Sequence, residues 1–225
     1  MEPLKKDFIT CDMIRDAGIK LAHKMYKEDG FVPDVIYDSL RGGAYLANVI
    51  SEYYKLQCSK EGREPVFYAA VVARSYGKLV EHTNKVDIDG WTWSPNNLKK
   101  GQKVLIVDDI FDTGLTVNSL VDTVMKAGIP REDIKVAVYD YKICTYQWID
   151  GKPALPVQPD YWCRKHVLNS KDDYLWIHYT CHEFIGLTHD EIEEVYHDDE
   201  VKKILHEICE DLSYLRQILR RLVFS

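Results

Sequence analysis

One stretch of the chain constrains its fold more than any other: Val104 to Thr116, which reads VLIVDDIFDTGLT. Its first four residues are β-branched or aliphatic, and such a run predicts a strand that is buried on both faces. Two carboxylates, Asp108 and Asp109, then end the strand. The loop that starts at Asp112 leads into apolar residues at helical spacing. The stretch therefore predicts a strand, a tight loop and the start of a helix.

The loop at this junction has the composition of a phosphate-binding site. The start of a helix offers free backbone N–H groups and the positive end of the helix dipole, and both favour an anion. Thr113 and Thr116 add hydroxyl donors. Asp108 and Asp109 would repel a phosphate, so we expect them to accept hydrogen bonds from vicinal hydroxyls and to support Mg²⁺. A ligand with a diol, a metal ion and a phosphate is a phosphorylated sugar.

Val104 to Thr116 resembles the 5-phosphoribosyl-1-pyrophosphate (PRPP) signature of type I phosphoribosyltransferases, in which two acids precede Asp-Thr-Gly-x-Thr. By this resemblance Asp112 faces N7 of the base and is the candidate general acid or base. Asp108 and Asp109 are the expected metal-supporting residues. The PRPP-binding residues that the resemblance implies are Leu40, Arg41, Gly42, Gly43, Asp108, Asp109, Asp112, Thr113, Gly114, Leu115 and Thr116.

A second strand, loop and helix begins at Asp34, and its loop reads Leu40-Arg41-Gly42-Gly43. This loop resembles the Leu-Lys-Gly-Gly form that binds pyrophosphate in purine phosphoribosyltransferases, although Arg41 stands where lysine is the more familiar residue. Two glycines let backbone amides approach an anion, and the charge of Arg41 would offset that of the leaving group, as a catalytic role requires. The resemblance also implies a cis peptide bond between Leu40 and Arg41.

Val66 to Val72 predicts a further strand, after which Ser75 and Tyr76 resemble the opening of the catalytic lid in hypoxanthine-guanine-type enzymes. We expect this lid to span about residues 74–97 and to exclude water from the reacting sugar. Trp91 and Trp93 fall inside that range, and we expect them to pack under the loop rather than to contact the base.

The base-binding residues follow a strand predicted over Ile134 to Tyr139. Lys142 stands where the family's lysine contacts O6 of 6-oxopurines, and a cation there would discriminate oxo from amino bases. Further on, WIHYTCHE resembles the family's Trp-Ile-x-x-Pro-Trp-Asp/Glu segment, with Cys181-His182 in place of Pro-Trp. This match implies that Trp176 stacks on the purine, that Ile177 reads its edge and that Glu183 supports Mg²⁺. A zinc site at His178, Cys181 and His182 is the competing hypothesis.

Strands that alternate with helices predict an α/β fold with a doubly wound, mostly parallel sheet and ligands at the carboxyl ends of the strands. We expect a phosphoribosyltransferase core over residues 1–142, a base-binding hood over 143–185 and a C-terminal helical extension over 186–225. In the extension, Thr188 and Glu191 have the spacing of a helix capping box. The apolar residues from Val201 to Leu222 form a heptad stripe that suits either packing on the protein's own core or a homodimer contact.

Composition narrows the class of protein. The formal charge of −7 and the absence of a long basic block argue against a nucleic-acid partner. Six cysteines without a Cys-x-x-Cys pair fit reduced thiols in the cytoplasm. The chain shows no signal segment and no apolar run long enough to cross a bilayer, so no membrane partner is expected.

The function predicted from the sequence is transfer of ribose 5-phosphate from PRPP to a 6-oxopurine base, which is hypoxanthine, guanine or xanthine. Mg²⁺ is the expected cofactor, and purine salvage is the expected role. Two other hypotheses remain open at this point. One is a PRPP-sensing regulator without catalysis on the same fold, and the other is transfer to a pyrimidine such as orotate or uracil.

Overall fold

The computed structural model describes residues 6–75, 86–145, 156–170, 173, 175–184 and 186–211. The chain divides into two compact units. The larger unit comprises residues 12–174, and the smaller unit comprises residues 1–11 together with residues 175–225.

The larger unit is built on a six-stranded sheet with the strand order β4-β3-β2-β5-β6-β7. All neighbouring pairs are parallel except β3 and β4, which are antiparallel. The strands are β2 (Val35–Leu40), β3 (Phe67–Ser75), β4 (Val86–Trp91), β5 (Val104–Phe111), β6 (Ile134–Cys144) and β7 (Tyr161–Leu168).

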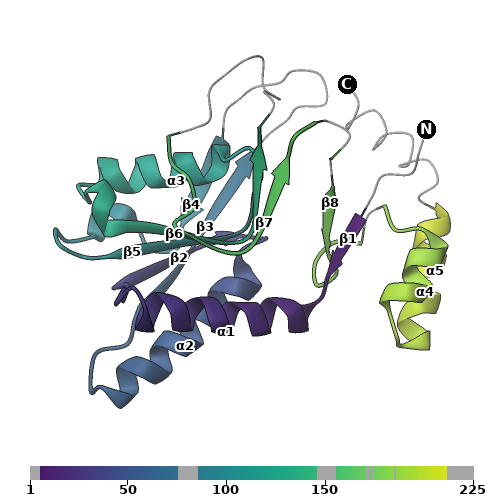
Figure 1. Ribbon diagram of the computed structural model, residues 1–225, viewed down its shortest axis with the longest axis horizontal. Coiled ribbons are helices and arrows are strands. Elements are labelled where there is room, and N and C mark those ends of the chain that lie inside the picture. Colours follow the sequence, from purple (N-terminus) through teal and green to yellow (C-terminus); the bar gives the residue numbers. More distant parts are fainter. Residues whose placement is uncertain are drawn as a thin grey trace. The chain divides into compact units, whose positions relative to one another are not determined.

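Helices cover both faces of this sheet (Figure 1). Helices α1 (Cys11–Lys27) and α2 (Ala44–Lys60) lie on one face, and α3 (Leu115–Lys126) lies on the other. A side chain at Gly18 would approach Val49 Cγ1 to 3.0 Å, so glycine allows α1 and α2 to pack closely. Two short 3₁₀ turns complete the unit, η1 (Pro95–Asn97) and η2 (Arg131–Asp133). The predicted doubly wound α/β fold is confirmed.

The core on the α3 side follows directly from the sequence pattern. Val104 to Val107 are entirely buried in the centre of the sheet, as their continuous apolar run predicts. Helix α3 buries Val117, Leu120, Val121 and Val124, which recur at helical spacing. Met125, which the same periodicity includes, is 43% exposed.

Two strands are longer than their apolar runs indicate. Asp108 and Asp109 lie within β5, because this strand stays paired with β6 as far as Phe111 and Tyr141. Lys142 lies within β6 rather than after it, because β6 stays paired with β7 to its last residue. Pairing with neighbouring strands therefore carries polar residues at the carboxyl ends into regular structure.

The second half of the lid expected over residues 74–97 has regular structure, and its role as a lid stays a prediction. Residues 86–91 form strand β4, and η1 follows it. Trp91 packs edge-on against Tyr37 at 4.6 Å, and Trp93 lies 5.0 Å from Phe67, both measured between ring centroids. Both tryptophans pack against the core, and their expected place under the loop stays a prediction. Only residues 76–85 of the expected lid, Tyr76 among them, lie outside the described residues.

The smaller unit pairs β1 (Lys6–Ile9) in parallel with β8 (Trp176–Tyr179), and it also holds helices α4 (His189–Val195) and α5 (Asp199–Asp211). The predicted capping box is confirmed, because Thr188 and Glu191 exchange side-chain to backbone hydrogen bonds. Leu205 of the expected heptad stripe is buried, whereas Val201 and Ile208 are 39% and 51% exposed. Residues 212–225 lie outside the described part, and the expected boundaries at residues 142 and 185 stay predictions.

Among the described residues, no helix has both the length and the apolar character needed to cross a membrane.

Candidate active site

The two sequence motifs meet at one edge of the sheet. Because β2 and β5 are parallel neighbours, with Asp38 opposite Val107, the loops that follow them lie side by side. We call residues 41–43 the β2–α2 loop and residues 112–114 the β5–α3 loop. This edge holds the carboxyl ends of the strands, where doubly wound sheets bind their ligands.

The glycines of the β2–α2 loop are required by close contacts. A Cβ atom at Gly42 would overlap the carboxylate of Asp109. A Cβ atom at Gly43 would lie 2.6 Å from the carbonyl oxygen of Val107 and 2.9 Å from that of Ser39. The peptide bond between Leu40 and Arg41 is cis, as predicted. The loop therefore lies directly against the end of β5, with the side chain of Arg41 exposed.

The β5–α3 loop has the form expected of an anion-binding turn. Gly114 adopts a left-handed conformation (φ +78°), and a Cβ atom there would overlap the ring of Phe111. Helix α3 begins at the next residue, and the hydroxyl of Thr113 accepts a hydrogen bond from the amide of Leu115 at 3.4 Å. The first turn of a helix leaves backbone N–H groups without helical partners, and these are available to a phosphate.

The two adjacent acids differ in their surroundings. Asp108 is only 7% exposed, and its Oδ1 accepts a hydrogen bond from the amide of Asp109 at 3.0 Å. Burial, and then the neighbouring Asp109, raise the pKa of Asp108 well above its ordinary value, although a hydrogen bond with Ser39 opposes this. Asp109 is half-buried and lies against Gly42. A cation or hydroxyl donors would relieve the repulsion between the two carboxylates.

Lys142 approaches this edge from β6. Its side chain is almost fully buried, and its Nζ lies 3.4 Å from Oδ2 of Asp112, whose side chain is 38% exposed. The structure therefore brings together the predicted base-binding lysine and the predicted general acid or base. A buried ammonium beside a carboxylate presents a fixed donor and a fixed acceptor to a ligand.

Three residues near Lys142 were not predicted from the sequence. Asp140 is fully buried, and its Oδ1 lies 2.7 Å both from Nε of Arg164 and from Nε2 of His166. His166 is the register partner of Lys142, and Arg164 is that of Asp140. No local motif marks them, because the contacts join strands that are more than twenty residues apart in the sequence.

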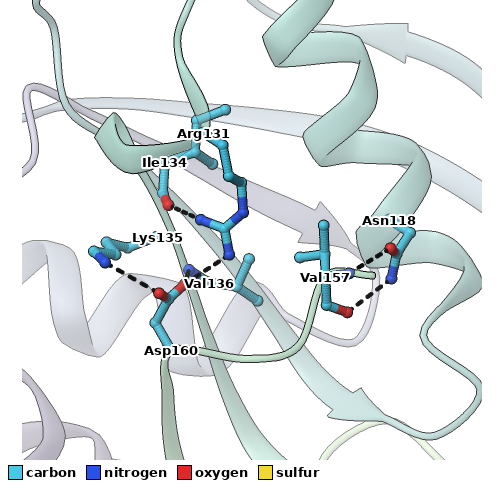
Figure 2. A network of polar contacts seen from close by, with 7 residues as sticks. All are labelled: Asn118, Arg131, Ile134, Lys135, Val136, Val157 and Asp160. Carbon is cyan, nitrogen blue, oxygen red and sulfur yellow. Dashed lines mark hydrogen bonds and ion pairs between the residues drawn. The ribbon is translucent and has the colours of Figure 1, made fainter. Parts of the chain in front are cut away.

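A further missed residue, Asn118, fastens the start of α3 to the chain before β7 (Figure 2). Its amide nitrogen donates to the carbonyl oxygen of Val157 at 3.0 Å, and its amide oxygen accepts from the backbone N–H of Val157 at 3.0 Å. The same nitrogen donates to the carbonyl of Gly114 at 2.9 Å. Asn118 therefore links the β5–α3 loop to a distant segment.

Asp160 anchors that segment at its other end (Figure 2). Its carboxylate accepts a hydrogen bond from the amide of Val136 at 2.9 Å and forms ion pairs with Lys135 at 3.1 Å and Arg131 at 3.5 Å. Asp160 and Asn118 thus hold the segment before β7 from both sides.

Three of the other predicted site residues belong to the smaller unit, which is described by itself. They are Trp176, Ile177 and Glu183, and Oε2 of Glu183 accepts from the amide of Tyr179 at 3.1 Å. The side chain of Ser75 lies outside the described part of the structure. Their roles stay predictions.

The zinc hypothesis is not supported. Cys181 Sγ and His182 Nδ1 lie 3.2 Å apart. Within the described ranges, however, no three His, Cys, Asp or Glu side chains gather in a way that could hold a metal ion.

Comparisons with known proteins show the family to which the chain belongs. The model of the phosphoribosyl transferase domain family matches residues 11–176. The bifunctional protein PyrR of Halalkalibacterium halodurans is 30% identical over 164 residues, which are 72% of this chain and 83% of that protein. The PyrR of Clostridium perfringens (strain 13) is 28% identical over 182 residues, which are 76% of this chain and 89% of that protein.

Solved structures share the fold. A purine phosphoribosyltransferase from Pyrococcus horikoshii has a TM-score of 0.57 and 24% identity, and the match covers 82% of this chain and 99% of that one. A hypothetical protein from Neisseria gonorrhoeae with bound ppGpp has a TM-score of 0.55 and 21% identity, with 81% and 92% covered.

Proposed function

The chain belongs to the phosphoribosyl transferase family, and from this premise we propose that it transfers ribose 5-phosphate from PRPP to a 6-oxopurine base and releases pyrophosphate. The observation that carries the proposal for the purine is the buried Lys142 beside Asp112. An ammonium group there suits a carbonyl oxygen such as O6, and a carboxylate suits the neighbouring ring nitrogen.

PRPP would bind across both loops. Its 5-phosphate would accept hydrogen bonds from the backbone of the β5–α3 loop and from the hydroxyls of Thr113 and Thr116. Its ribose hydroxyls would donate to Asp108 and Asp109. Its pyrophosphate would lie on the β2–α2 loop, where Gly42 and Gly43 allow close approach and Arg41 supplies positive charge. The close approach of Gly42 to Asp109 supports this arrangement. It brings the carboxylate proposed to bind the ribose hydroxyls next to the loop proposed to bind the pyrophosphate.

In the reaction the bond between C1 of the ribose and the pyrophosphate oxygen breaks, and a bond from N9 of the base to C1 forms. Positive charge develops on the sugar ring, and the carboxylates of Asp108 and Asp109 would stabilise it. Asp112 would hold N7 of the base or move its proton. Ser75 and Tyr76 would cover the site and exclude water, which otherwise competes with the base for C1.

Mg²⁺ is the cofactor that we expect. The described residues offer the adjacent carboxylates of Asp108 and Asp109, and this small donor set fits an ion that takes most of its ligands from water and substrate phosphates. Bound there, Mg²⁺ would offset the charge of the leaving pyrophosphate. The part of Glu183 in this site stays a prediction.

The relatives are called bifunctional proteins, and this favours a second candidate function. In it the same PRPP site serves a regulatory role, without catalysis or beside it. Transfer to a pyrimidine such as uracil or orotate is a further alternative, and the assay described below tests it as well.

We further propose a cytoplasmic homodimer without a nucleic-acid partner, in which the exposed Val201, Ile204 and Ile208 of α5 contribute to the dimer contact.

The test is an assay of pyrophosphate release from PRPP with hypoxanthine, guanine, xanthine, uracil and orotate in turn, with and without Mg²⁺. We expect release with at least one 6-oxopurine, and only when Mg²⁺ is present. Release with a pyrimidine alone would contradict the purine assignment. PRPP binding without release for any base would favour the regulatory function.

A further inference from the structure

Asp38 is a buried carboxylate that no sequence motif explains. It lies on β2 and is only 2% exposed. Its Oδ2 accepts a hydrogen bond from the hydroxyl of Tyr68, on β3, at 2.7 Å. Its Oδ1 is buried and has no hydrogen-bond partner within the described part of the chain. An unpaired buried oxygen is costly, so its position calls for a reason.

The unpaired oxygen points at the start of α2. A Cβ atom built on Gly43 would lie 3.0 Å from Oδ1 of Asp38, and Gly43 is the residue that precedes the first turn of this helix. The first turn carries no acidic side chain. The positive end of the helix dipole would attract an anion in the β2–α2 loop. It therefore also attracts the negative charge of ionised Asp38.

The surroundings of Asp38 set the balance between its ionised and its protonated form. Tyr68 on β3 favours the ionised form through its hydrogen bond. Burial dominates and raises the pKa of Asp38 from 3.8 to about 6. Both forms are therefore populated near neutral pH.

We propose that Asp38 is a buried negative charge that competes with pyrophosphate: its ionised form weakens the binding of the anion to the β2–α2 loop and so assists release of the product. The proposal rests on the proposed function, in which this loop binds pyrophosphate. Two negative groups that share one positive helix end repel each other. By linkage, pyrophosphate binding then favours uptake of a proton by Asp38.

The experiment measures binding of inorganic pyrophosphate with Mg²⁺ by calorimetry at pH 5 and pH 8, for the wild type and for Asp38→Asn. Asparagine has nearly the shape of the protonated carboxyl and cannot ionise. We expect the variant to bind pyrophosphate about tenfold more tightly than the wild type at pH 8, and within about twofold at pH 5. Titration of pyrophosphate itself affects both proteins equally and cancels in the comparison.

Tyr68→Phe is the second variant, and Tyr37→Phe is its matched control. Removing the hydroxyl of Tyr68 removes the hydrogen bond that favours ionised Asp38, so the pH at which pyrophosphate affinity starts to fall should move upward. Tyr37 precedes Asp38 on β2, and its buried hydroxyl has no hydrogen-bond partner among the described residues. Its loss should leave that pH unchanged.

Calorimetry in two buffers with different ionisation enthalpies adds a readout that a purely structural role would not move. We expect the wild type to take up more protons than Asp38→Asn when pyrophosphate binds at pH 7. An equal affinity ratio at both pH values, or equal proton uptake, would overturn the inference while leaving the proposed function intact. Absence of pyrophosphate binding in every protein would instead contradict both.

Discussion

At the scale of single residues, the candidate site depends on contacts that tolerate little change. Asp112 lies 3.4 Å from the buried ammonium of Lys142 and belongs to the loop that we expect to hold the 5-phosphate. We expect its side chain to act on the base and to contribute little to the affinity for PRPP. This separation of roles can be tested with one substitution.

We expect Asp112→Asn to bind PRPP within about threefold of the wild type and to lower turnover about a hundredfold or more, because the amide cannot take up a proton. Turnover is measured by pyrophosphate release and PRPP affinity by calorimetry. Asp122→Asn, on the exposed side of α3, is the matched control and should leave both unchanged. Normal turnover in Asp112→Asn would exclude the proposed role.

Gly42→Ala should damage the site more than the fold. The added methyl group would overlap the carboxylate of Asp109, which must then move away from the β2–α2 loop. We expect PRPP affinity to fall at least tenfold, while the free energy of unfolding changes by about 1 kcal/mol or less. Gly90→Ala, where a Cβ atom meets nothing within 4 Å, is the control. Equal PRPP affinity in both variants would contradict the proposed contact.

At the scale of elements, Asn118 is the link between helix α3 and the chain before β7 (Figure 2). We expect Asn118→Ala to lower the free energy of unfolding by about 2 to 3 kcal/mol, because it removes two hydrogen bonds with Val157 and leaves buried backbone groups unpaired. Urea unfolding measures this. Asn48→Ala is the control, because Asn48 makes the corresponding bond within α2 and is exposed. A similar small loss in both variants would show that the link is unimportant.

The elements also show what the sequence could reveal. Local sequence patterns were sufficient to predict the buried strand from Val104 to Val107, the buried face of α3 and the capping box at Thr188. Each of these features depends on residues that are close together in the sequence. The cis peptide before Arg41 was predicted through the family resemblance. These features need no knowledge of distant contacts.

Features that depend on pairing between distant strands were missed. Strand β4 falls within the range assigned to the lid from Ser75 and Tyr76; it forms by antiparallel pairing with β3 and by packing of Trp91 on Tyr37. The partners Asp38 with Tyr68, and Asp140 with Arg164 and His166, likewise meet across strands. The sequence of one strand does not show whether a charged residue in it will be buried beside a partner on another strand.

At the scale of the whole molecule, Asp38 should make stability depend on pH. Its pKa is about 6 in the folded protein and near 3.9 in the unfolded chain. The folded state thus keeps this proton to higher pH. The stability that the proton contributes is present in full below about pH 4 and is lost as the pH rises through about 6, with a total of roughly 3 kcal/mol.

Replacement by asparagine removes this dependence. We expect the free energy of unfolding of Asp38→Asn, relative to the wild type, to rise by about 2 to 3 kcal/mol between pH 4 and pH 7.5. Urea unfolding at several pH values gives the difference directly, and the other titrating groups cancel. A difference that stays constant over this range would show that Asp38 ionises at its ordinary pKa.

The central claim is that one edge of the sheet holds a whole PRPP molecule between two loops. A crystal structure of the protein with PRPP and Mg²⁺ tests it most directly. We expect the 5-phosphate on residues 112–116, the ribose hydroxyls on Asp108 and Asp109, and the pyrophosphate on residues 40–43. PRPP bound elsewhere, or with its pyrophosphate turned away from the β2–α2 loop, would contradict it.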